Sequence, residues 1–310
     1  MFGYSLPAAL TGAHPVARAM AMMLLSSLSF ICMHALVARA SQDLPAFEVA
    51  FFRNLFGFLW LLPALLRGRF AALKTKKLHL HALRGAVNSA SMLMFFSALA
   101  FTPLAQATAL AYTSPLFVTI GAALVLGETL RLRRLTALLF GFAGMLLVLR
   151  PGVIEIGTGP LLVLGSALLW AVAMIDIKIL SRTDSSLTIA AYMVVFLTPM
   201  TFIAALFVWQ WPTLPQIGLL MLIGAFGTIG HLLFNEAFRQ ADATILAPLD
   251  FTKLIWASVI GFFAFGQVPD LWTWIGGSVI FASATYISYR EHQLARQATK
   301  AAAAAQTPRN

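Results

Sequence analysis

The chain is built from long apolar runs that come in two matching sets of five. Charged residues make up only 10% of the 310 residues, and they gather in short clusters between the runs. Each run holds about 20 mostly uncharged residues, a length that crosses a bilayer as a helix. We therefore predict an all-α membrane protein with ten transmembrane helices. The ten runs lie at residues 18–39, 45–66, 81–102, 104–126, 132–149, 160–180, 187–208, 216–238, 243–265 and 271–289.

The placement of the basic residues predicts how the helices are oriented. With the N-terminus in the cytoplasm, the even-numbered connections carry clusters of Lys and Arg, whereas the odd-numbered ones hold only Arg39 and Arg150. This is the positive-inside asymmetry of a multi-pass protein with both termini in the cytoplasm. The net charge of +10 therefore indicates topology and contact with membrane lipid, not nucleic-acid binding. Residues 290–310 are expected to form a cytoplasmic tail, frayed from residue 295 onward.

The two sets of helices resemble each other in sequence. Residues 100–111 contain Ala-Phe and then Ala-Thr-Ala-Leu-Ala, and residues 237–247 contain Ala-Phe and then Ala-Thr-Ile-Leu-Ala, an offset near 137 residues. A chance match in an Ala- and Leu-rich chain is the alternative, but both copies fall at the same helix–turn–helix position. Because each half has an odd number of helices, the second half is inverted, and substrate is expected in a central cavity between the halves. The predicted repeats are residues 18–149 and 160–289.

Four local features support a family resemblance. They are the five-plus-five helices, Pro115 followed by Leu126-Gly127-Glu128, the stretch Leu168-Leu169-Trp170-Ala171, and the arginine in Phe51-Phe52-Arg53-Asn54. With these features the chain resembles the EamA-type members of the drug/metabolite transporter superfamily from about residue 18 to residue 289. Within that family it is most similar to bacterial exporters of aromatic amino acids, which implies an amino acid or a similar small metabolite as the substrate.

The second half departs from the family pattern at one position. Gly266-Gln267 stands where such proteins often carry Gly-Glu. We therefore expect that the structural role of a Glu at this position of the second half is absent here.

Two prolines interrupt corresponding helices of the two halves. Pro115 lies in the fourth run and Pro248 in the ninth. Proline removes an intrahelical hydrogen bond, and paired interruptions point to the binding site and moving parts of a transporter. A simple packing kink is the alternative interpretation.

The ninth run also carries two opposite charges, Asp250 and Lys253. They are three residues apart and therefore share a helix face. Lys253 lies about 15 Å into the helix by its rise per residue, where an unpaired charge is costly. Two interpretations remain open: a structural ion pair, or a Lys253 that meets a substrate carboxylate.

Further polar and aromatic residues are candidates for the transport pathway. His231 and Asn235 are four residues apart on one face of the eighth run, and Tyr112 and Ser114 come just before Pro115. For each residue alone, helix packing is the competing explanation. The remaining candidates are His34, Arg53, Asn88, Trp170 and Tyr192.

Several function classes are disfavoured. The chain has no phosphate-binding loop of the Gly-rich Lys-Ser/Thr type, so ATP hydrolysis is not expected to drive transport. Cys32 is the single cysteine, and no second histidine or carboxylate has ligand spacing to His231, so we expect no metal and no cofactor.

Two alternatives to amino-acid export remain. One is efflux of drugs or quaternary cations, and Lys253 counts against it. The other is a membrane enzyme or lipid-handling protein, for which no reactive constellation is present.

Small residues mark the fifth and tenth runs. Gly141 and Gly144 lie in the fifth run, and Gly276 and Gly277 in the tenth. Because glycine lets helix backbones approach closely, we expect these helices to form a scaffold, or alternatively a homodimer face.

Overall fold

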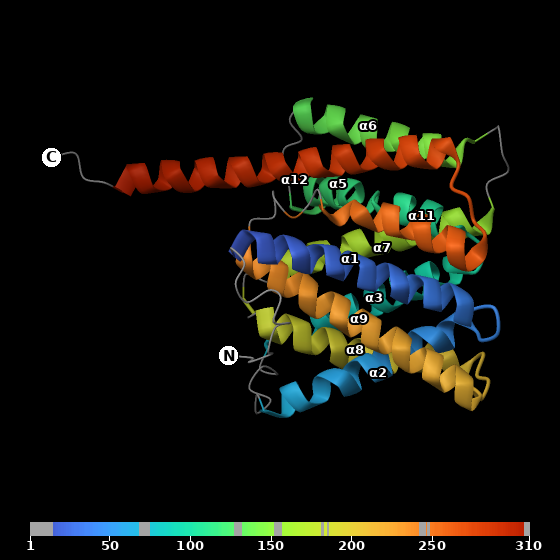
Figure 1. The fold of residues 1–310 in the computed structure, drawn as a ribbon. Helices are drawn as coiled ribbons and strands as arrows, with labels where there is room; N and C mark the ends of the chain where they lie inside the picture. The colour runs from blue at the N-terminus through green and yellow to red at the C-terminus, as the bar shows by residue number, and fades with distance from the viewer. Residues whose placement is uncertain are drawn as a thin grey trace.

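The protein is a bundle of long helices (Figure 1). The described part of the chain contains no strand. Its helices are α1 (Pro15–Ala40), α2 (Ala46–Arg67), α3 (Leu78–Leu99), α4 (Leu104–Ala111), α5 (Ser114–Leu126), α6 (Leu132–Leu149), α7 (Thr158–Leu180), α8 (Ser186–Leu206), α9 (Leu214–Gln240), α11 (Thr252–Phe265) and α12 (Leu271–Gln306). This computed structural model describes residues 15–67, 75–126, 132–151, 157–180, 183–184, 186–241, 246 and 249–306.

The helices agree with the predicted all-α membrane fold. Among the described residues, four helical stretches are long and apolar enough to cross a membrane, and four further apolar stretches are shorter. The four long stretches are Val16–Ala40, Leu104–Val125, Thr158–Ile177 and Leu214–Phe238.

The helix contacts form a symmetric pattern. When α1 is matched with α7, α2 with α8, α3 with α9 and α6 with α12, the packing of α1 on α9 corresponds to that of α7 on α3. Likewise α2 packs against its own counterpart α8, and α6 against its counterpart α12. In Figure 1, α6 and α12 lie along one side of the bundle and α2 and α8 along the opposite side. This is the pairing expected of two similar five-helix halves.

Two helix boundaries differ from the predictions. The predicted frayed tail is instead helical as far as Gln306, and Figure 1 shows α12 projecting beyond the rest of the bundle. Its last turns are rich in Ala, the residue with the highest helix propensity. The run 104–126, which Pro115 is predicted to interrupt, is divided into α4 and α5, and the break lies at Tyr112 and Thr113, just before Pro115.

The glycines of α6 and α12 bring these helices into backbone contact. A Cβ at Gly276 would lie 2.5 Å from the carbonyl oxygen of Gly144, and one at Gly144 would lie 2.8 Å from the carbonyl oxygen of Gly276. No side chain fits in that space. These two glycines therefore hold the scaffold of a single chain together.

Candidate functional site

The break between α4 and α5 positions the first part of the site. Tyr112 and Thr113 separate the two helices, and the Thr113 hydroxyl donates a hydrogen bond of 2.7 Å to the carbonyl of Leu110. Pro115 follows within the first turn of α5, where its missing N–H costs nothing. Pro248, the proline predicted to interrupt the corresponding helix, lies outside the described residues.

Tyr112 links this break to the second half of the chain. Its hydroxyl donates a hydrogen bond of 2.8 Å to the carbonyl oxygen of Asp250, just before α11 begins. Its ring packs between those of Phe251 and Phe281, with centroids 6.2 and 5.6 Å away. The break between α4 and α5 is therefore joined to the residues just before α11 in the second half.

Five of the predicted site residues come together in what we call the central cluster: His34, Arg53, His231, Asp250 and Lys253. They come from α1, α2, α9, the segment before α11, and α11, and all five are half-buried. The charges of Arg53 and Lys253 act on both imidazoles. Residues far apart in the sequence thus form one polar group between the two halves.

Asp250 and Lys253 form an ion pair. Lys253 Nζ lies 2.5 Å from Asp250 Oδ1, and the two side chains are 20% and 24% exposed. The ammonium also lies 5.2 Å from the ring centroid of Phe30 and 5.9 Å from that of Phe234, distances at which aromatic faces attract cations. Of the two interpretations of this pair, the geometry favours the structural one.

Arg53 has a different environment. Its guanidinium lies against Gly227 of α9, where a Cβ would be 3.1 Å from Nε and 3.2 Å from Nη2. Its Nη1 donates to Oδ1 of Asn54 at 2.9 Å, and Asn54 in turn donates to the hydroxyl of Thr201 at 3.2 Å. The structure shows no carboxylate in ion-pair contact with Arg53 among the residues it describes.

Aromatic rings that are not among the predicted site residues surround the cluster. Phe30 meets His231 edge-on with centroids 4.9 Å apart, and Phe95 meets His34 in the same way at 4.9 Å. The buried indole nitrogen of Trp256, one turn beyond Lys253, has no hydrogen-bond partner among the described residues. The i, i+3 spacing from Lys253 would have identified Trp256, but isolated Phe residues in an apolar sequence carry no comparable signal.

Other predicted pathway residues lie apart from these contacts. Asn88 is buried on α3, which packs against α7 and α8, and Tyr192 stacks on His81, with centroids 4.5 Å apart. Ser114 is half-buried, whereas Trp170 and Asn235 are exposed, Asn235 one helical turn beyond His231.

A second polar group joins α3 to the connection between α7 and α8. His81 Nε2 lies 2.7 Å from Asp184 Oδ2, and the Thr75 hydroxyl donates to the same oxygen at 2.6 Å. The hydrogen bonds from Thr75 and His81 hold the pKa of Asp184 below its usual range. We call His81, Asp184 and Thr75 the α3–α7 clasp, because they tie together the two halves.

The clasp predicts a pH-dependent contribution to stability. Because the folded-state pKa of Asp184 is lowered, its contribution is complete above the unfolded value of about 4 and is lost as pH falls through the folded value. Asp184→Asn should therefore lower the thermal midpoint of the solubilised protein at pH 7, and this difference should shrink below about pH 4. Thermal unfolding of both proteins across pH 3–8 measures it. The matched control is Asp43→Asn, which removes an exposed ion pair with Arg39 and should have little effect; an Asp184 difference as small as this would contradict the prediction.

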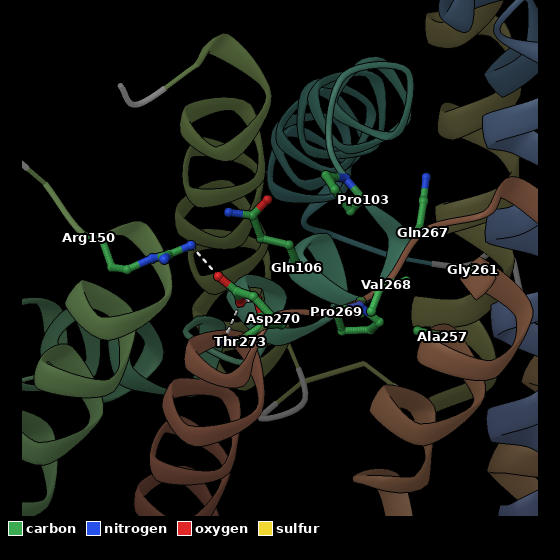
Figure 2. Close-up of a pocket in the computed structure, with 11 residues that line it drawn as sticks. Pro103, Gln106, Arg150, Ala257, Gly261, Gln267, Val268, Pro269, Asp270 and Thr273 are labelled. Carbon is green, nitrogen blue, oxygen red and sulfur yellow. Dashed lines mark hydrogen bonds and ion pairs between the residues drawn. The ribbon is translucent and has the colours of Figure 1, made fainter. Parts of the chain in front are cut away.

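A third polar group closes the opposite end of the bundle, beside a cavity of about 240 Å³ (Figure 2). Arg150 pairs with Oδ2 of Asp270, whose Oδ1 accepts hydrogen bonds from the backbone and hydroxyl of Thr273. Asp270 thus caps the start of α12.

Gln267 has a structural role that the sequence did not predict. Its Oε1 accepts a 2.9 Å hydrogen bond from the backbone N–H of Leu104, so our expectation that position 267 has lost its structural role is wrong. An amide oxygen suffices to satisfy a free N–H at the start of α4.

The described residues contain no group of three or more His, Cys, Asp or Glu side chains that could hold a metal ion. The central cluster instead offers cations, one carboxylate and aromatic faces. Chemically it is equipped to bind an organic molecule.

Comparison with known proteins gives a consistent result. The model of the EamA-like transporter family matches residues 17–150 and 157–289. The chain is 32% identical to a riboflavin transporter of Vibrio cholerae, covering 92% of this chain and 97% of the relative. It is also 29% identical to an S-adenosylmethionine uptake transporter of Rickettsia bellii (80% and 85% covered) and 32% identical to the pseudopaline exporter of Pseudomonas aeruginosa (85% and 93% covered). A solved crystal structure matches with a TM-score of 0.56 over 87% of this chain and 97% of that one, and at 19% identity it shows the fold alone.

Proposed function

The chain belongs to the EamA-like transporter family, and from this membership we propose that it is a secondary transporter working by alternating access. Like the relatives it matches, it is a membrane transporter and not an enzyme. The observation that carries the proposal is the central cluster, which draws its side chains from both halves. Substrate sites of transporters built from inverted repeats lie at that interface, and the α4–α5 break linked by Tyr112 to Asp250 provides a segment that can change shape.

The proposed substrate is an amino acid or a similar small metabolite. A cluster with cations, a carboxylate and aromatic rings suits a molecule that has charged groups on an apolar body. A permanent drug-like cation would meet the excess positive charge of the cluster, since Asp250 balances Lys253 and leaves Arg53, which disfavours the efflux alternative. Riboflavin is the second candidate, because a riboflavin transporter with 32% identity covers nearly the whole chain and flat rings can pack on Phe30 and Phe95.

We further propose export across a bacterial inner membrane, with both termini in the cytoplasm. The Lys and Arg asymmetry supports this orientation, and one relative is an exporter. Another relative is an uptake transporter, which carries its substrate in the opposite direction.

Counterflow in proteoliposomes tests the proposal. Vesicles preloaded with an unlabelled amino acid should take up the same labelled amino acid faster than empty vesicles, and the rate should saturate with concentration. This stimulation by substrate on the far side is specific to a carrier that alternates between two states. Riboflavin and S-adenosylmethionine complete the panel, and protein-free liposomes are the control. The absence of stimulated uptake for every compound would contradict the proposed function.

A further inference from the structure

We propose that Arg53, and not Lys253, binds the substrate, and that the group it binds is a carboxylate. This inference rests on the proposed function, because it assigns the chemistry of the central cluster. It predicts a transporter selective for metabolites with one free carboxylate beside an aromatic or apolar portion.

The distribution of charge carries the first step. Lys253 is already neutralised by Asp250 at 2.5 Å, and the aromatic faces of Phe30 and Phe234 add to its stabilisation. Arg53 is half-buried, its hydrogen-bond acceptor in the structure is the neutral amide of Asn54, and the described residues supply it with no ion-pair partner. Arg53 and the Asp250–Lys253 pair together leave one positive charge. A buried charge is costly until it is paired, so the site is completed by an anion.

The amount of charge identifies the anion. A carboxylate carries a single negative charge, which would neutralise the excess of one. A phosphate monoester carries nearly two charges at neutral pH and would leave the site negative. The planar guanidinium also matches the geometry of a carboxylate, which it can bind through two parallel hydrogen bonds.

Neighbours on two sides fix the position of Arg53. Asn54 holds Nη1 and is itself held by Thr201. On the other side Gly227 makes room for the guanidinium, because a Cβ there would be 3.1 Å from Nε. Gly227 is near the middle of α9, so the guanidinium is placed deep within the bundle.

Aromatic side chains of the central cluster's surroundings offer contacts for the apolar portion of the substrate. Phe30 and Phe95 present rings beside the two imidazoles, and no residue in the described part of the chain accepts a hydrogen bond from the indole N–H of Trp256. An aromatic ring can pack among these side chains while its carboxylate reaches Arg53.

Matched ligands test the proposal. 3-Phenylpropanoate and 3-phenylpropanamide differ only in the carboxylate, and neither carries an ammonium group, so the acid brings a single negative charge. Their binding to the purified protein in nanodiscs can be compared by calorimetry. We expect the acid to bind at least about tenfold more tightly than the amide, as a charge-assisted hydrogen bond requires. Arg53→Gln should abolish this preference, and Arg53→Lys should retain part of it, because it keeps the charge without the planar fork. The double variant Lys253→Met with Asp250→Asn should keep the preference.

Each other outcome overturns the proposal. If the preference survives in Arg53→Gln and disappears in the Lys253 double variant, the carboxylate is bound by Lys253. If Arg53→Gln does not fold, Arg53→Lys and Gly227→Ala, which crowds the guanidinium without changing its charge, replace it; an undiminished preference in both would exclude Arg53. If wild type transports riboflavin in counterflow but does not distinguish acid from amide, the substrate class is wrong while the transporter function stands. If no panel compound is transported, both fail.

Discussion

Replacing Lys253 with Met is expected to destabilise the protein and reduce transport at least about tenfold. Met keeps much of the side-chain length and removes the charge that lies 2.5 Å from Asp250. The carboxylate of Asp250 would then be left half-buried without a counter-ion, at a cost of about 2 kcal/mol. Because the carbonyl of Asp250 also accepts the hydrogen bond from Tyr112, a rearranged Asp250 would disturb the contact between the α4–α5 break and the start of α11.

The double variant Lys253→Met with Asp250→Asn separates structure from substrate binding. It removes both charges, so no buried carboxylate remains unpaired, and we expect thermal stability and most of the transport rate to return. Stability is measured by thermal unfolding in detergent, and transport by counterflow with L-phenylalanine. A double variant that is stable and inactive would show that one of these charges is needed for transport itself, contrary to our assignment of Arg53.

Replacing Gly276 with Ala is expected to lower stability markedly even though Ala favours helix formation. The new Cβ would lie 2.5 Å from the carbonyl oxygen of Gly144 and 2.6 Å from Cγ2 of Val148. Because the carbonyl is part of the backbone, the clash is relieved only by moving α6 away from α12. We expect a net loss of about 2 kcal/mol, seen as a lower thermal midpoint and less monodisperse protein after extraction.

Gly218→Ala is the matched control. It lies on α9, and a Cβ there would have no atom within 4 Å. It should gain up to about 1 kcal/mol from helix propensity. Equal midpoints for the two variants would contradict close backbone contact between α6 and α12.

Much of the fold could be predicted from the sequence. Apolar runs long enough to cross a membrane leave the backbone no alternative to helix, since its polar groups have to be satisfied within each segment. The three-residue spacing of Asp250 and Lys253 likewise predicts a contact, because residues three apart lie on the same face of a helix. Such local rules fail where a neighbouring element intervenes. The sequence predicts that position 267 has no structural role, but α4 places the backbone N–H of Leu104 within 2.9 Å of Gln267 Oε1.

The sequence by itself determined the helical runs and the candidates for the site, because bilayer length, helix periodicity and charge placement act along the chain. Only the tertiary structure decided which candidates meet. It brought His34, Arg53 and His231 to the Asp250–Lys253 pair, and it placed Tyr192 on His81 in the α3–α7 clasp. It also distinguished the two cations, since Lys253 has a carboxylate partner and Arg53 rests against Gly227. The physical reason is that pairing of a buried charge depends on groups from other helices, and helix packing, not spacing along the chain, sets which groups those are.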